Sequence, residues 1–108
     1  MKVGGFPPET VAVAPTSTVV VECDVRHAQR LALFVANLDG SQTFSGTIER
    51  WMVTGQTPAA STIGDFASVG PGVSVMADLD VSCTAYIRLV GTMSGAGGSV
   101  SVSGADRR

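Results

Sequence analysis

Turn-forming residues divide this chain into short pieces, and that spacing limits the fold more than any other feature. Gly, Pro and Asp recur so that the segments between them are mostly about 5–12 residues long, the length of β-strands with their turns. No window carries apolar residues at i, i+3, i+4 and i+7 over three turns, as an amphipathic helix would. The sequence therefore predicts an all-β domain, a single antiparallel β-sandwich (jelly-roll-like) of about seven or eight short strands.

Residues 30–38 form the most apolar segment, and both of its faces are apolar. Such a segment predicts a central strand covered on each side, which favours a sandwich. Residues 81–93 give the clearest alternation, with Ala85, Ile87 and Leu89 on one face. Further strands are expected at 18–25 (Val19, Val21, Cys23 and Val25 on one face), 43–54 with a bulge at Gly46, 61–69, 73–77 and 99–103 (Val100 and Val102 inward).

The 108 residues suffice for one domain. Residues 1–15, which contain Gly and Pro, are expected to be a flexible N-terminal arm, and residues 16–108 the β-sandwich domain. Within the arm, positions 11–14 allow a short edge strand at best, because Pro15 ends the run. Turns are expected at 39–41, where Asp-Gly favours a tight hairpin with positive φ, and at 70–72. Residues 94–98 should form a Gly-rich hairpin, and residues 104–108 a polar tail.

A weak internal echo joins the two halves of the chain. Asp24-Val25 and Asp80-Val81 each stand shortly before the strongest strand of their half, at 31–35 and 86–90. Two interpretations stay open: an internal pseudo-symmetry, and the chance reuse of common β-residues.

Charge limits the classes of partner. Charged residues make up only 15% of the chain, the formal net charge is −2, and the seven basic residues form no stripe. This pattern argues against binding to nucleic acid or to an anionic membrane. The sequence has no run of about 18 apolar residues, the length that a membrane span requires, and residues 1–8 lack the apolar stretch of a signal peptide. The protein is therefore expected in the cytoplasm or in an assembly made there. The low charge suits a chain packed against other subunits, or equally a soluble sheet covered by Ser and Thr.

The sequence offers little catalytic chemistry. His27 is the single histidine and falls in a polar corner, where an exposed, idle side chain is expected. Asp78 and Asp80 have the spacing of paired ligands or of a glycosidase pair, but next to a turn they should cap backbone N–H groups, as should Asp39. No nucleophile elbow or phosphate loop occurs. We therefore predict no enzyme and no catalytic, cofactor-binding or metal-binding residue.

The remaining conspicuous side chains have structural explanations. Cys23 and Cys83 fall in predicted strands and should be two buried, inert thiols, with a disulfide as the less favoured alternative. Trp51, Tyr86 and Phe34 should pack in the core or at a subunit contact rather than form a sugar-stacking platform. Arg50 and Arg88 should lie at an interface or pair with a carboxylate, for which Glu22 and Glu49 are candidates.

Two stretches resemble small virion proteins of tailed phages. They are residues 80–92, Asp-Val-Ser-Cys-Thr-Ala-Tyr-Ile-Arg-Leu-Val-Gly-Thr, with the closing 98–104, and the earlier Cys23-Asp24-Val25 with 31–37. The form, a Gly/Pro arm followed by a β-sandwich, is similar to capsid decoration (cement) proteins. The resemblance is one of style and transfers no binding residue.

The resemblance implies a mechanical role on the virion. Homotrimers would sit on the capsid surface, bind the major capsid protein and stabilise the shell after assembly in the host cytoplasm, using no cofactor. The alternative from another class is a carbohydrate- or host-receptor-binding β-sandwich module of a phage tail or fibre, which would need an exposed aromatic platform.

Overall fold

The chain folds into nine strands, seen in a computed structural model that describes residues 1–52 and 61–108. Residues 53–54, the end of the expected 43–54 strand, and the loop expected at 55–60 lie outside the described residues. No helix among the described residues is long and apolar enough to cross a membrane. The strands are β1 (Lys2–Val3), β2 (Phe6–Val13), β3 (Thr18–Asp24), β4 (Arg30–Asn37), β5 (Phe44–Trp51), β6 (Ser61–Val69), β7 (Ser74–Asp80), β8 (Tyr86–Met93) and β9 (Gly98–Arg107).

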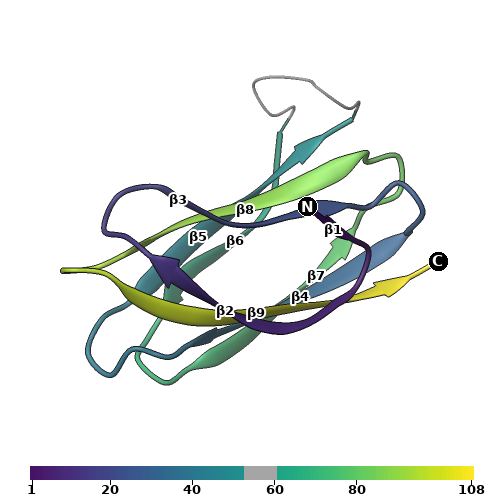
Figure 1. Cartoon of the computed structure of the whole chain (residues 1–108). Helices are drawn as coiled ribbons and strands as arrows, with labels where there is room; N and C mark the ends of the chain where they lie inside the picture. Colours follow the sequence, from purple (N-terminus) through teal and green to yellow (C-terminus); the bar gives the residue numbers. More distant parts are fainter. Residues whose placement is uncertain (53–60) are drawn as a thin grey trace.

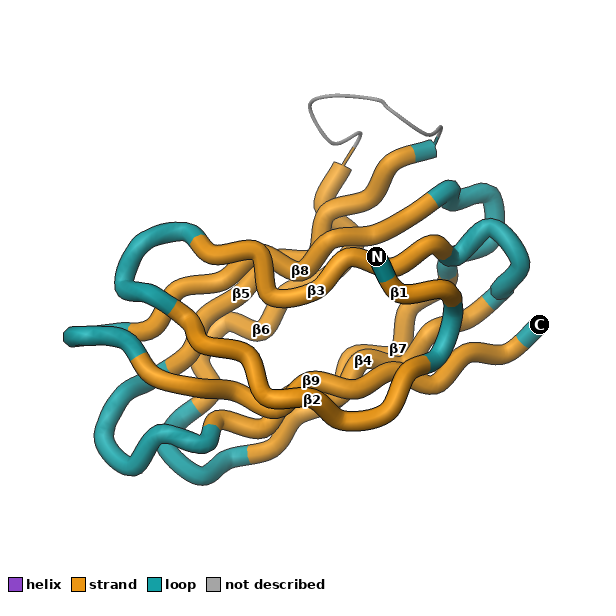
Figure 2. The backbone as a smooth tube through the Cα atoms, viewed as in Figure 1, coloured by secondary structure: helices purple, strands orange, loops and turns teal. Residues whose placement is uncertain are grey.

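Two sheets form the two layers of a sandwich (Figures 1 and 2). We call the sheet with strand order β1-β3-β8-β5-β6 sheet A and the sheet with order β2-β9-β4-β7 sheet B. From β2 onward the chain passes from one sheet to the other at every connection except the one between β5 and β6, which are neighbours in sheet A. Apart from the two-residue β1, each sheet has four strands, and two four-stranded sheets wound in this way are the arrangement of a jelly roll. The predicted β-sandwich is therefore confirmed; among the described residues every strand pair is antiparallel except the short parallel pair of β1 with β3, and β1 is a strand beyond the seven or eight expected.

The core lies between the inward faces of the two sheets. Leu31, Leu33 and Val35 of β4 alternate with less buried neighbours, as do Ile87 and Leu89 of β8, which confirms the strand faces expected for β8. Val100 and Val102 of β9 point inward between half-buried serines, again as expected.

The Phe44 ring occupies space left by two glycines. Gly46 and Gly91 are cross-strand partners on β5 and β8. A Cβ at Gly91 would lie 2.5 Å from Cε1 of Phe44 and 2.9 Å from the Ser45 carbonyl oxygen. A register shift between Phe44 and Gly46 in the β5–β6 ladder agrees with the bulge expected there.

The two halves of the sandwich are related by a pseudo-two-fold in their strand register. Asp24 pairs with Tyr86 on β3 and β8, and Arg30 pairs with Asp80 on β4 and β7. One constant offset in residue number relates the two pairs, since it carries position 24 to position 80 and position 30 to position 86. The same shift turns the β5–β8 ladder into the β9–β4 ladder. The internal pseudo-symmetry is therefore present in the fold.

The echo marks two equivalent corners of this arrangement. Val25 and Val81 are both buried, and their N–H groups donate to the carbonyls of Ala85 and Gln29, respectively. In each corner the aspartate before the valine accepts a hydrogen bond from the backbone N–H two residues further on. Asp-Val is therefore repeated because both corners need one buried anchor and one side-chain acceptor.

The expected flexible arm is instead part of both sheets in this structure. β1 pairs with β3, β2 pairs along β9 as an edge strand, and Lys2 Nζ lies 2.6 Å from a Glu9 carboxylate oxygen. The glycines provide a crossing between sheets, because Gly4 has a φ of +64° and a Cβ there would lie 2.6 Å from Asp106 Oδ2. Buried Phe6 anchors the start of β2. The expected polar tail likewise belongs to β9, which continues to Arg107.

Three expectations about strand faces and turns were wrong. β4 is covered on one face only, since Phe34 is 43% exposed. Val19 is exposed because a register shift between Val19 and Val21 moves it off the buried face. The segments 39–41 and 94–98 connect different sheets rather than closing hairpins, and Gly40 is not among the positive-φ glycines. The turn at 70–72 is confirmed, with Gly72 at φ +71° and the Val73 N–H donating to the Gly70 carbonyl.

Candidate functional site

The outer face of sheet B exposes two large apolar side chains next to each other. Alternation along β4 and β7 turns Phe34 and Met76 outward, and the two are direct cross-strand partners that are 43% and 54% exposed. Phe34 also faces Ser103 on β9. We call this surface the Phe34 face and define it as Ala32, Phe34, Ala36, Ser74, Met76, Ser101 and Ser103.

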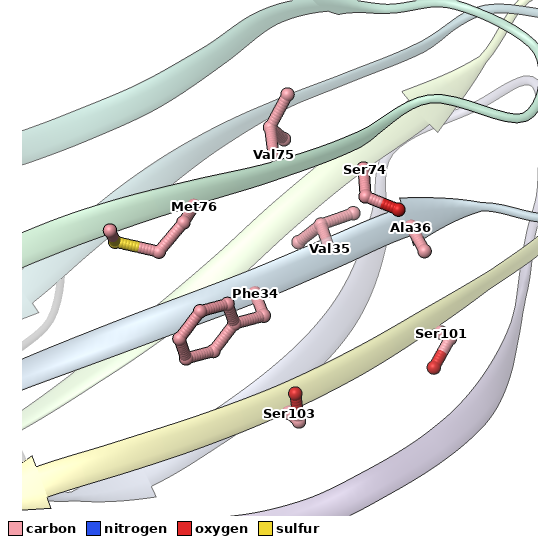
Figure 3. Close-up of a pocket in the computed structure, with 8 residues that line it drawn as sticks. All are labelled: Phe34, Val35, Ala36, Ser74, Val75, Met76, Ser101 and Ser103. Atoms are coloured by element: carbon pink, nitrogen blue, oxygen red, sulfur yellow. The ribbon is translucent and has the colours of Figure 1, made fainter.

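A shallow depression of about 420 Å³ lies on this face. Figure 3 shows the Phe34 ring and the Met76 thioether side by side at one end, with the hydroxyls of Ser101 and Ser103 along β9. Its lining consists of apolar side chains and serine hydroxyls, with no titratable group. A surface of this kind offers burial and weak hydrogen bonding, whereas acid–base chemistry needs a titratable group.

One end of the Phe34 face is charged. Arg30 Nε donates to Asp78 Oδ1 over 3.2 Å, so Asp78 takes part in an exposed ion pair and the capping role expected for it was wrong. Asp80 does cap: it accepts from the hydroxyl and the backbone N–H of Ser82, and these bonds, the hydroxyl first, lower the pKa of its carboxyl. Asp78 and Asp80 therefore stabilise the end of β7 and its corner.

A second cluster lies on sheet A. Trp51 and Tyr86 stack with ring centroids 4.8 Å apart, and the Arg88 guanidinium lies 4.6 Å from the Trp51 ring centroid. Arg88 also pairs with Glu49 at 3.2 Å, one of the two partners expected for it, and Arg50 is half-buried with an interaction of its own. Trp51 is only 4% exposed, so the expectation that it packs rather than forms a platform is confirmed.

Sequence reasoning missed a buried polar network around Asn37. The Asn37 amide donates to the carbonyls of Gln42 (2.8 Å) and Val69 (2.9 Å), and its oxygen accepts from the Asp39 N–H. Gln42 in turn exchanges two hydrogen bonds with the backbone of Gly97. The network fixes three sheet-to-sheet connections, and the one signal in the sequence was a lone asparagine at the end of an apolar strand.

Asp39 behaves as expected, although its turn does not. Its carboxylate accepts from the N–H groups of Ser41 and Gln42, both at 2.8 Å, and these backbone bonds lower its pKa. Charge at Asp39 therefore stabilises the connection between β4 and β5.

The other candidate groups remain separate. His27 is exposed in its corner, as expected. Cys23 is buried, which raises the pKa of its thiol to about 12. Cys83 is exposed at a φ of 63° in a turn, so the expectation of a second buried cysteine was wrong, and both thiols are free. Within residues 1–52 and 61–108, no three His, Cys, Asp or Glu side chains are grouped so that they could hold a metal ion.

Comparison with known proteins gives a likeness of fold. No protein-family model and no curated protein matches the chain. Two similar solved structures come from infectious bursal disease virus. The Gt-strain structure is 12% identical over 93% of this chain and 29% of that chain, with a TM-score of 0.45. The Gx-strain structure is 13% identical over 94% and 32%, with a TM-score of 0.44. This chain thus spans about a third of those chains, and a likeness at this level carries no argument about function.

Proposed function

We propose that this chain is a virion structural protein, specifically a head decoration (cement) protein that binds and stabilises a capsid shell. The observation that carries the proposal is the Phe34 face, where an exposed apolar pair lies among alanines and serines on a regular sheet. Such a face suits burial against another protein. The jelly-roll arrangement agrees with the proposal by fold-level analogy, since viral capsid proteins are one of its recurring uses and lectins and cupins are others.

The proposed mechanism is mechanical. A protein that binds only the expanded shell stabilises that form by mass action, by about 2.7 kcal/mol per site when its free concentration is 100 times the dissociation constant. No reaction is assigned to the chain, which also carries no basic stripe for the packaged genome. The proposed partner is the major capsid protein and the proposed place is the outer capsid surface. The homotrimer implied by the sequence resemblance concerns copies on the shell and stays a prediction.

The test uses heads of the virus that encodes the chain. Purified protein is added to expanded and unexpanded heads, and binding is measured by co-sedimentation. We expect saturable binding to expanded heads alone and a higher melting temperature of the decorated shells. Phe34→Ser should weaken binding, whereas Val19→Ser, an exposed valine on sheet A, should leave it unchanged. If the protein bound neither expanded nor unexpanded heads, the proposal would be contradicted.

The alternative, a carbohydrate- or receptor-binding module, has less support. A sugar-stacking platform needs several exposed aromatic rings. Trp51 is 4% exposed, and the exposed Phe34 has Met76 and Ser103 as its cross-strand neighbours rather than a second ring. A glycan that raises the melting temperature of the wild-type protein but not of Tyr86→Ala would favour the alternative over the cement proposal.

A further inference from the structure

Among the residues that the structure describes, the two sheets end in four edge strands, and these differ in how they resist pairing. Sheet A ends at β1 and β6, and sheet B ends at β2 and β7. Every second residue of an edge strand points its N–H and C=O away from the sheet, so an unprotected edge is a template for another strand.

Three edges carry protection. β1 has only two residues, and the part of β3 that it leaves open has a register shift between Val19 and Val21 in its ladder with β8. β2 begins with Phe6-Pro7-Pro8, and its ladder with β9 shifts register between Phe6 and Glu9. The β6 ladder with β5 shifts register twice. Prolines, bulges and short length are the means by which natural edge strands avoid pairing.

The β7 edge has none of these three features, and its charged residues, Asp78 and Asp80, stand at one end only. Its seven residues, Ser-Val-Met-Ala-Asp-Leu-Asp, contain no Pro, Gly or Lys, and its ladder with β4 runs without a register shift from Ser74 to Asp80. Within the part of the chain that the structure describes, no strand is hydrogen-bonded to its outer side. The edge also borders the Phe34 face, because Met76 is the strand's own outward residue and Phe34 is its neighbour.

We propose that β7 pairs with β7 of a second copy of this chain, antiparallel across a two-fold axis at Met76. The contact joins the two copies of sheet B into one continuous sheet. It is independent of the proposed cement function, since it concerns the chain alone in solution. Because a two-fold contact uses the same patch on both copies, the patch must be self-complementary.

The Met76 register meets that condition. It places Met76 opposite Met76 of the second copy. The cross-strand row Ser103–Phe34–Met76 then continues across the axis as Met76–Phe34–Ser103 of the second copy. Asp78 then faces Ser74 of the second copy, and inward Ala77 faces Val75, so apolar residues meet on the core side.

Other registers are worse. Centring the pair on Asp78 places two carboxylates opposite each other, and centring it on Leu79 sets Asp78 against Asp80. Centring it on Ala77 sets Met76 against a carboxylate. A slip by one residue turns each outward side chain against an inward one. The charge pattern of β7 therefore excludes the registers centred on Ala77, Asp78 and Leu79, and the Met76 register is favoured among the rest because it sets the exposed Met76 against its own copy.

Sedimentation velocity from about 1 μM to about 1 mM tests the pairing. A single strand pair buries less than the roughly 800 Å² per partner of a standard interface, so we expect a dimer with a dissociation constant of about 1–100 μM. Met76→Lys and Met76→Glu each put like charges on the axis and should raise the dissociation constant at least about tenfold. An equimolar mixture of the two variants should dimerise again. Val19→Lys, which changes a similarly exposed valine on sheet A, should dimerise like wild type.

A covalent trap provides the second measurement. Paired Cα atoms in an antiparallel ladder are about 4.5–5.5 Å apart, within the range that a disulfide spans. Met76→Cys in a Cys83→Ser background should therefore oxidise to a covalent dimer, and Val19→Cys in the same background should not. A monomer throughout the concentration range, a trimer, or a dimer that Met76→Lys leaves intact would overturn the proposal. Failure of the charge-swapped mixture to associate, with both variants folded by Trp51 fluorescence, would do the same.

Discussion

Changing Asn37 to Asp replaces two hydrogen-bond donors with a carboxylate and alters little else in size. Asn37 is 1% exposed, and its amide nitrogen donates to the carbonyl oxygens of Gln42 and Val69. An ionised Asp at this position has no donor and would hold its charge against two carbonyl dipoles. Asn37→Ala is the companion variant, because it removes the amide without adding charge.

The magnitudes follow from the groups left without partners. In Asn37→Ala the Val69 carbonyl, whose bond is buried, loses its side-chain donor at a cost of about 1–3 kcal/mol, while Gln42 O and Asp39 N are half-exposed and can bind water. We expect a total loss of about 2–4 kcal/mol. Asn37→Asp at pH 7 should lose about 4–5 kcal/mol, since a buried charge without a partner costs about 3–5 kcal/mol. Domains of this kind have about 5–15 kcal/mol in all, so both losses are measurable.

The two variants also differ in how they respond to pH. The folded environment would raise the pKa of the carboxyl introduced by Asn37→Asp above its unfolded value of about 3.9. The folded state then binds the extra proton, so Asn37→Asp should be most stable, relative to wild type, below pH 4 and lose stability as pH rises toward the folded pKa. Asn37→Ala should keep a constant difference from wild type.

Urea unfolding followed by the fluorescence of Trp51, the single tryptophan, measures these differences between pH 3 and 8. Gln29→Glu makes the same amide-to-carboxylate change at an exposed corner and should stay within about 0.5 kcal/mol of wild type. If Asn37→Asp were as stable as Asn37→Ala at pH 7, with no pH dependence of its own, the buried network would not hold the connections in the way argued.

Three further predictions use the same unfolding assay or a thiol reagent. Gly91→Ala should lower the free energy of unfolding by about 1–3 kcal/mol, because the new Cβ meets the Phe44 ring. The double variant with Phe44→Leu should lose less than the sum of the two single losses, by at least about 0.5 kcal/mol. Strictly additive losses would contradict the contact. Acid should weaken the fold below about pH 4, because the pKa of Asp39 is lower in the folded state than in the unfolded state. The stability that this carboxylate contributes is present above its unfolded pKa and is lost as pH falls through its folded pKa. In Asp39→Asn the fall in unfolding free energy at acid pH should therefore be smaller. A thiol reagent at pH 8 should label Cys83 quickly and Cys23 only on unfolding; two fast thiols would show that Cys23 is accessible.

Periodicity predicted the strands whose burial follows simple alternation. β8 alternates without a break and β9 does so around Val100 and Val102, so the inward places of Leu89 and Val102 could be read from residue type. One buried face of one regular strand leaves little freedom in the sequence pattern, and that determines both the strand and its register.

The features that sequence reasoning missed depend on contacts between distant segments. Gly4 and Pro7 are typical of a loose arm, yet β2 is ordered by its ladder with β9, at the far end of the chain, where Phe6 pairs with Gly104. Asn37 is unremarkable until Val69 and Gln42 come within hydrogen-bond distance of it. Such partners are set by topology, which a local pattern of turns and strands does not determine.

On the outer face of β4, the residue pattern predicts a covered strand, whereas the fold of one chain leaves the face exposed. A strand that is apolar on both faces is normally covered on both, because burying a Phe side chain contributes about 1.5–3 kcal/mol. One chain covers the face of Leu31 and Leu33 and leaves Phe34 exposed, with small Ala32 and Ala36 on either side of it. The alanines keep the surface flat around the ring, so a second layer or a neighbouring strand meets no steric obstacle there. The residue pattern of β4 is thus that of a strand in an assembly. A capsid partner on this face would supply the cover that the single chain lacks, whereas a second copy along β7 would continue the same face into a larger surface.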